Sequence, residues 1–475
     1  MGNMGLDLRK FYQATNPSQV LQADSPEDDK YYIDFSEVRG GRIIEELRDN
    51  ITFFNPDSPT CELFTGHIGC GKSTELLRLK AALEKAEFHV VYFESSQDLE
   101  MGNVDIGDIM LAIASRVTES IESLEKISLP QPRGFQRIIN GALKVLQTEI
   151  DLSAEAALPG VGKISASSAG EFSMKAGLPG IGEAKASNDE GVSLVLGIGK
   201  ITAKAKNSLE LRKKLKDYLE PQTGSILEII NTELIEPSVE KLNQYGKKGL
   251  VVIVDNLDRV ENIIKAWGRP QPEYLFVDRG EQLRQLKCHL IYTMPLSLMF
   301  SNDYNRLTSR IVMEPKVLPM VPVRLRNGNE CVLGMKNMRQ MVLARAFPDL
   351  DPEQRLGLIS EVFDTPETLE RLCQISGGHV RELLQLLRSL IMKERKLPLS
   401  RAFLERVIQE KSNQMQLGVD DQEWELLRKV QKTQQVKGDQ EYQILIGTRL
   451  VYEYHDSQGS WFQVNPILAE SGNLI

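Results

Sequence analysis

Cysteine is scarce in this chain, and long apolar runs are missing. The five cysteines stand at positions 61, 70, 288, 331 and 373, with no pair at CxxC spacing. An odd, scattered set of this kind fits a reducing compartment and argues against a disulfide framework or structural zinc. No apolar run approaches the ~20 residues that span a bilayer, and no apolar secretory segment is visible at the N-terminus. We therefore expect a cytoplasmic protein without a membrane span.

Positive charge is also in short supply. The chain has 57 Lys and Arg against 66 Asp and Glu, a net charge of −9 over 475 residues. This balance disfavours a broad nucleic-acid footprint. A basic cluster at 212–216 is interpreted as a solvated helix face, with nucleic-acid contact as the less favoured alternative. The length allows two or three domains with ordinary cores.

Residues 66–73 form a complete phosphate-loop motif, GxxxxGK[ST]. A strand-like stretch (63–65) precedes it and a run of helix formers follows, which is the context that the motif requires. Backbone N–H groups of such a loop and the following helix N-terminus bind phosphate oxygens. Lys72 would reach the β and γ phosphates, and Ser73 would bind Mg²⁺. The predicted nucleotide-binding residues are Gly66, His67, Ile68, Gly69, Cys70, Gly71, Lys72, Ser73 and Thr74.

Further apolar stretches predict buried strands at 88–93, 251–255, 289–293 and 317–321. Ligands of open α/β sheets bind at the carboxyl ends of the strands. Asp255, at such an end on a neighbouring strand, is expected to hold Mg²⁺. Asp258 is the candidate for orienting and activating the attacking water, because Asn256 cannot act as a base. Thr293 ends another strand and could sense the γ-phosphate.

Two segments differ from this core. Residues 1–30 are polar and are expected to form a loose arm, and Arg39-Gly40-Gly41 then precedes an amphipathic helix. Residues 152–207 contain Leu-Pro-Gly-Val-Gly at 158–162 and Leu-Pro-Gly-Ile-Gly at 178–182, with alternating residues between them. We interpret this segment as a β-hairpin-like insertion or a flexible arm. It is either a partner-contacting or membrane-contacting ribbon or a variable solvated insertion, and its small residues favour the second.

These parts, in this order, resemble AAA+ and STAND ATPases. Residues 252–259 (Val-Ile-Val-Asp-Asn-Leu-Asp-Arg) are similar to the hhhhDDLDR signature of KAP-like NTPases. Residues 376–383 (Ser-Gly-Gly-His-Val-Arg-Glu-Leu) resemble the sensor-2 region of origin-recognition ATPases, which implies that Arg381 reaches the nucleotide from a lid helix. Ser309-Arg310 is similar to the arginine-finger sequence of clamp loaders. Where AAA+ proteins carry a Glu, this chain has Asn256, so Asp258 acts instead or hydrolysis is slow, as suits a switch.

The C-terminal region resembles a winged-helix module. Helices are predicted at 403–411 and 421–430, and two alternating strands at 450–454 and 461–464. In relatives this module reads DNA or clamps the nucleotide domain shut. Its mixed charge favours an autoregulatory or protein-contact role over DNA binding. We expect Trp461 and Phe462 to be core residues.

The sequence thus predicts an α/β fold: a doubly wound parallel sheet of the phosphate-loop NTPase type, a helical lid and a winged-helix-like domain. The expected segments are an arm (1–30), the core (31–151 and 208–330), the insertion (152–207), the lid (331–400) and the C-terminal domain (401–475). The predicted activity is hydrolysis of ATP with Mg²⁺ by a switch controlling oligomerisation or a separate effector protein, for example in signalling or anti-phage defence. The alternatives are a DNA-binding initiator or transposition regulator, and a scaffold that holds ATP without hydrolysing it.

Overall fold

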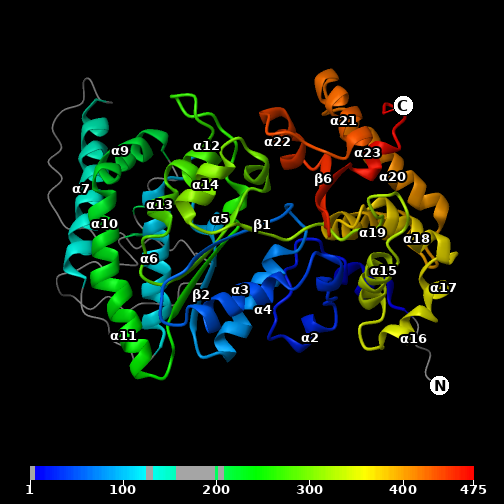
Figure 1. The fold of residues 1–475 in the computed structure, drawn as a ribbon, viewed down its shortest axis with the longest axis horizontal. Helices are drawn as coiled ribbons and strands as arrows, with labels where there is room; N and C mark the ends of the chain where they lie inside the picture. Colours follow the sequence, from blue (N-terminus) through cyan, green and yellow to red (C-terminus); the bar gives the residue numbers. More distant parts are fainter. Residues whose placement is uncertain (1–5, 125–131, 157–197, 200, 202–207, 475) are drawn as a thin grey trace. The chain divides into compact units, whose positions relative to one another are not determined.

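The structure is a computed structural model that describes residues 6–124, 132–156, 198, 199, 201 and 208–474 (Figure 1). The chain divides into two compact units. One consists of residues 1–109 and 235–475, and the other of residues 110–234. The Leu-Pro-Gly repeats of the expected 152–207 insertion lie outside the described residues.

Five described strands of the larger unit form one parallel sheet in the order β2-β3-β4-β1-β5. Strands β1, β3 and β4 are buried along their whole length, as expected for parallel strands covered on both faces. The α/β class and the strands expected near 63, 88, 251 and 289 are confirmed. The strands are β1 (Cys61–Thr65), β2 (His89–Glu94), β3 (Leu250–Asp255), β4 (His289–Met294) and β5 (Lys316–Val317).

Two strand predictions are wrong. Asp255 does not lie on a strand adjacent to the one before the phosphate loop, because β4 lies between β1 and β3. The strand expected at 317–321 has only two residues, since the chain leaves the sheet after Leu318. The Leu318 N–H donates to Thr65 O at 2.7 Å, and the Met320 N–H donates instead to Glu453 O at 3.2 Å, on the C-terminal hairpin.

Helix α4 (Lys72–Lys85) packs on β2 and β3, and α3 (Ile43–Asp49) packs on α4. Leu76, Leu79 and Leu83 recur at helical spacing and contribute to the core on this side of the sheet. Other helices and turns of this region are η2 (Asn50–Phe54), α5 (Ser95–Asp98), α11 (Glu236–Gln244), η5 (Leu257–Arg259), α12 (Gln271–Glu273), η6 (Tyr274–Asp278), α13 (Gly280–Leu283), η7 (Leu296–Phe300) and α14 (Tyr304–Ile311).

The lid is a helical bundle with its own core. Its helices are α15 (Val332–Ala346), α16 (Pro352–Leu356), α17 (Ile359–Val362), α18 (Pro366–Ile375), α19 (Val380–Glu394) and α20 (Arg401–Gln416). Leu404, Val407 and Ile408 of α20 belong to this core, so the lid continues past the expected boundary at residue 400.

The N-terminal segment differs from the loose arm that was expected. Helix α1 (Leu8–Ala14) packs on α15 and α19, and Phe11 is buried in the lid core. Asp7 caps α1, and Ser25 caps α2 (Pro26–Asp29). The short turn η1 (Ser36–Val38) follows. The polar composition of this segment led to the wrong prediction, because a few apolar residues such as Phe11 are enough to pack it against the lid.

The C-terminal module contains α21 (Asp421–Thr433), α22 (Gln440–Gly447), the antiparallel hairpin β6 (Val451–Asp456) and β7 (Gly459–Val464), and α23 (Pro466–Ala469). The two faces of the hairpin enter different cores. Tyr452, Tyr454 and Trp461 pack in the core of the sheet. Val451 and Phe462 pack with α21 and α22. The predicted helices and strands are confirmed, and Trp461 and Phe462 are core residues.

The smaller unit is helical in its described part. It contains most of α6 (Ile106–Glu122), then α7 (Arg133–Ala156), α9 (Leu209–Leu219), η3 (Glu220–Gln222), α10 (Thr223–Ile230) and most of η4 (Asn231–Ile235). Helix α7 packs on α9 and α10. The Glu233 carboxylate accepts hydrogen bonds from Gly134 and Phe135 N–H groups at the start of α7. These helices were expected to belong to the nucleotide core and instead form a separate unit.

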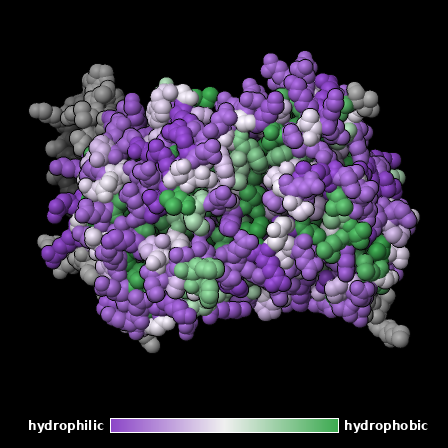
Figure 2. All heavy atoms as spheres, in the orientation of Figure 1, coloured by the Kyte–Doolittle hydropathy of each residue, from purple (hydrophilic) through white to green (hydrophobic). Residues whose placement is uncertain are grey.

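Within the described residues, no helix combines the length and apolarity needed to cross a bilayer. On the face drawn in Figure 2, hydrophilic residues predominate and apolar residues gather in separate patches.

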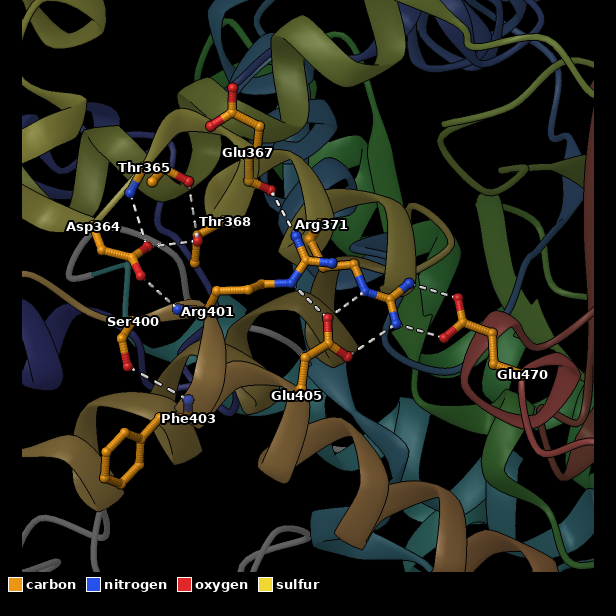
Figure 3. Close-up of polar contacts among 10 residues, drawn as sticks. All are labelled: Asp364, Thr365, Glu367, Thr368, Arg371, Ser400, Arg401, Phe403, Glu405 and Glu470. Carbon is orange, nitrogen blue, oxygen red and sulfur yellow. Dashed lines mark hydrogen bonds and ion pairs between the residues drawn. The ribbon is translucent and has the colours of Figure 1, made fainter.

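An ion-pair network joins the lid to the C-terminal module (Figure 3). Arg371 of α18 donates to both carboxylate oxygens of Glu405 on α20 and contacts both oxygens of Glu470, just after α23. Arg401 also donates to Glu405. Burial raises the pKa of Glu405, but the hydrogen bonds from the two arginines outweigh it and hold this pKa below its ordinary value.

Replacing Arg371 by Met should lower the free energy of unfolding at neutral pH by about 1 kcal/mol, because the carboxylates are partly exposed and screened. Glu405 has a lowered pKa in the folded state, so its contribution is full above the ordinary value of 4.5 and is lost as the pH falls below it. Thermal unfolding at several pH values measures this. Arg306→Met is the control, since Asp303 keeps Arg269 as a partner. Equal effects of both variants at neutral pH would contradict the prediction.

Candidate functional site

The phosphate loop joins β1 to α4, as its sequence context predicts. Gly66, Gly69 and Gly71 have positive φ values of 156°, 93° and 109°, which side-chain-bearing residues rarely adopt. The N–H groups of Ile68, Gly69 and Gly71 have no hydrogen-bond partner among the described residues. Next to the N-terminus of α4, such N–H groups form an anion-binding site.

Lys72 is buried, with only 5% of its surface exposed. Its Nζ donates to Gly66 O at 2.7 Å and to His67 O at 3.0 Å, and it forms an ion pair with Asp258 Oδ2 at 3.0 Å. Burial lowers the pKa of Lys72, but the charge of Asp258 outweighs this, so the pKa lies above its ordinary value. Asp258 Oδ1 is buried with no partner among the residues described. The sequence-predicted Lys72 and Asp258 therefore meet at one point.

Asp255 and Ser73 are both hydrogen-bonded to the side chain of one tyrosine, Tyr92. The Tyr92 hydroxyl donates to Asp255 Oδ2 at 2.7 Å and is also in hydrogen-bond contact with the Ser73 side chain. Burial and then the charge of Asp255 raise the pKa of Tyr92, so the phenol stays protonated. The two expected metal ligands, Ser73 in α4 and Asp255 at the end of β3, thus lie on either side of one hydroxyl group, although β3 is not adjacent to β1, the strand before the loop.

Thr293, at the end of β4, holds the turn that carries Asp258. Its Oγ1 accepts from Leu257 N at 2.9 Å and lies 3.4 Å from Asp258 N. Arg310, on α14, donates to Asp278 O at 3.1 Å and is not among the residues that line the cavity described below. The structure therefore brings Thr293 to Asp258 and leaves Arg310 outside the cavity.

A cavity opens at the phosphate loop. Its walls come from the loop itself, the turn after β3, the lid and the N-terminal segment. Five cationic side chains and two carboxylates line it, a balance that favours a polyanion. The lining residues are 17–21, 31–33, 35, 39, 68–75, 256, 258, 259, 341, 345, 380, 381 and 384. Sequence reasoning missed the N-terminal wall, because residues 17–35 carry no motif.

Arg39 is a buried site residue for which the sequence analysis predicted no role. Its guanidinium donates to Cys70 O at 2.7 Å and lies over the Phe35 ring. Its Nε is buried without a partner in the described part of the chain. The Arg-Gly-Gly sequence was the available signal, but spacing alone could not connect Arg39 to Cys70, which lies 31 residues further along the chain.

The lid reaches the phosphate loop through the start of α19. The Arg381 N–H donates to Gly69 O at 3.2 Å, and the Arg381 side chain lines the cavity. Burial, and then the nearby charge of Arg259, lower the pKa of Arg381. Gly69 is tightly enclosed, because an added Cβ would lie 2.9 Å from both Arg381 Cβ and His379 Cε1.

The His67 ring is directed to the C-terminal hairpin. Its Nε2 accepts from Glu453 N at 2.8 Å, and its ring meets Tyr452 edge to face. Burial lowers the pKa of His67 to about 3, so the ring is neutral. His67 therefore connects the loop to β6, a contact that the sequence did not predict.

Gly378 offers a test of how closely the lid approaches. Its φ is +75°, and an added Cβ would lie 1.7 Å from Val321 O. Gly378→Ala should therefore destabilise the protein by about 2 kcal/mol or more. Gly447→Ala is the matched control, because nothing lies near its added Cβ. Urea unfolding measures both, and equal stabilities would show that this close approach is absent in solution.

No family model matches the chain, and no curated protein matches it. Solved structures similar to it include Cdc6p from Pyrobaculum aerophilum, with 10% identity over 97% of this chain and 96% of that one and a TM-score of 0.36. The Aeropyrum pernix ORC2 protein, solved as ADPNP–ADP complexes, has 10% identity, 97% coverage of both chains and a TM-score of 0.36. The Aeropyrum pernix ORC1 protein, solved in complex with DNA, has 12% identity, coverage of 97% and 96%, and a TM-score of 0.35.

At these TM-scores the likeness assigns neither function nor partner to this chain. The chain's own strand order and phosphate loop give it an α/β fold with a candidate polyphosphate site at the carboxyl ends of the strands.

Proposed function

We propose that this protein binds ATP with Mg²⁺ in the cavity at the phosphate loop and hydrolyses it slowly, as a molecular switch. The observation that carries the proposal is the set of N–H groups at Ile68, Gly69 and Gly71, which lack partners among the described residues and adjoin buried Lys72. A triphosphate supplies the acceptors that these donors need. It would compete with Asp258 for Lys72.

The residues present fit a magnesium ion. Ser73 and Asp255 provide two oxygen ligands on either side of the Tyr92 hydroxyl. Mg²⁺ prefers oxygen ligands and is commonly held by one or two side chains together with phosphates and water. When bound, the ion would neutralise charge on the phosphates. The protein would contribute by holding the Ser73 and Asp255 oxygens close together, through their shared contact with the Tyr92 hydroxyl.

For hydrolysis, Asp258 is the proposed base and Thr293 the residue that positions it. The hydrogen bonds of Thr293 fix the turn, so Asp258 would lie close to the phosphates held by Lys72. A carboxylate paired with a lysine is a weak base, so this chemistry requires Lys72 to move to the phosphate. That requirement supports slow turnover. Arg381 would contact the nucleotide from the lid, and Arg310 would act only on the site of a second copy.

The output of the switch would be the position of the lid and the C-terminal module, transmitted to a second copy or a partner protein in the cytoplasm. A protein partner is favoured over DNA because both faces of the hairpin are buried in cores. The hairpin therefore leaves only its tip, around residues 455–460, exposed to a DNA groove.

Lys72→Ala should abolish nucleotide binding, because it removes the charge that meets the phosphates. Asp258→Asn should bind Mg·ATP at least as tightly as the parent, since it no longer competes for Lys72 as a charged group. Its turnover should fall by about 10²–10⁴-fold, the usual contribution of a general base. Calorimetric titration and phosphate release measure these effects.

The two variants test different parts of the proposal. Tight binding by Lys72→Ala would contradict the nucleotide site itself. Hydrolysis by Asp258→Asn at the parent rate would remove Asp258 as the base and leave the site intact.

A further inference from the structure

Two carbonyl groups of the phosphate loop are held by donors from the lid. His379 Nε2 lies 3.0 Å from Ile68 O, and the Arg381 N–H donates to Gly69 O at 3.2 Å. Both donors stand at the start of α19, directly after the Gly377-Gly378 turn. The lid thus contacts the backbone of the loop, in addition to presenting the Arg381 side chain to the cavity.

The protonation of His379 follows from its two contacts. Its Nδ1 accepts from Glu382 N at 3.0 Å, capping α19. Burial, and then the nearby His67 and Arg449, hold the pKa of His379 well below its ordinary value, so the ring is neutral. A neutral ring whose Nδ1 accepts carries its proton on Nε2. Nε2 therefore donates to Ile68 O.

This bond fixes the direction of one peptide group. In a planar trans peptide, C=O and N–H point in opposite directions. With Ile68 O directed at His379, the N–H of Gly69 points away from the His379 ring. It is one of the loop donors that have no partner in the described chain, and Gly69 lines the cavity.

We propose that His379 is a positioning residue that couples the lid to the phosphate loop. Its Nε2–H keeps the Ile68–Gly69 peptide in the orientation that offers an N–H group to polyphosphate. When the lid moves away, the carbonyl loses its donor and this orientation is no longer favoured. Nucleotide binding and lid position then promote each other by the same factor. The inference rests on the proposed nucleotide site and adds a route of control to it.

The surroundings of His379 support a fixed ring. Tyr452 of the hairpin stacks on it at 5.5 Å with an interplanar angle of 23°. The Tyr454 hydroxyl donates to Gly377 O at 2.7 Å, which holds the turn before α19. The C-terminal module therefore sets the position of the imidazole, and through it that of the loop.

Two substitutions separate the two roles of the ring. His379→Ser keeps a side-chain oxygen that can cap α19 but is too short to reach Ile68 O. His379→Gln is long enough to donate to Ile68 O but is a poorer cap. Leu387→Ala is the control for lost stability, because Leu387 is buried in the lid core and is not among the residues lining the cavity.

The probes are Mg·AMPPNP and adenosine, titrated at a temperature where all variants are folded. We expect His379→Ser to weaken Mg·AMPPNP binding about tenfold, the loss of one hydrogen bond. Adenosine, which has no phosphates, should bind to it as to the parent. His379→Gln should bind Mg·AMPPNP within about threefold of the parent although it is less stable, and Leu387→Ala should bind it unchanged.

Parent-like Mg·AMPPNP affinity of His379→Ser, or equal losses for Mg·AMPPNP and adenosine, would overturn the role of His379 while leaving the nucleotide site in place. Should the serine variant not fold, a tenfold loss in His379→Gln would overturn it equally. Failure of the parent chain to bind Mg·AMPPNP would instead remove the proposed function, and this inference with it.

Discussion

The buried charge of Lys72 is the constraint on which the arrangement of the site depends. An ammonium group removed from water needs oxygen partners close by. Two carbonyl groups of its own loop and the Asp258 carboxylate supply them. Asp258 is held in turn by the β3 turn that Thr293 of β4 supports. One cation therefore brings together the ends of β1, β3 and β4.

The C-terminal hairpin is the second organising element, because it is a layer shared by two cores. One face adds Tyr452, Tyr454 and Trp461 to the core of the sheet, while the other face packs with the C-terminal helices. The hairpin also donates to His67 of the loop and to Gly377 of the lid. A movement of the lid or of the loop would consequently break or shift hydrogen bonds of the C-terminal module. This coupling is the behaviour expected of a switch.

Much of this architecture can be predicted from the sequence, since local patterns determine it. Apolar runs marked the buried strands, alternation marked the hairpin, and the phosphate loop with its flanks marked the site. The positions of strands relative to one another could not be predicted in this way. The insertion of β4 between β1 and β3, and the early departure of the chain from β5, depend on packing partners far away in sequence. The N-terminal wall of the cavity was missed because its attachment to the lid rests on a few apolar residues such as Phe11. Arg39 and His379 bind carbonyl groups of the loop backbone. Every residue has such a carbonyl group, so a sequence motif does not indicate which of them accept a hydrogen bond.

Nucleotide binding by this chain rests on the phosphate-loop N–H groups that have no partner within the described residues. Hydrogen exchange of residues 66–73, followed by mass spectrometry with and without saturating Mg·ATP, tests it most directly. Bound Mg·ATP should markedly slow exchange in this loop, because the phosphates accept from its N–H groups. Unchanged exchange in the loop at saturation would show that the nucleotide binds elsewhere and that these N–H groups do not hold the phosphates.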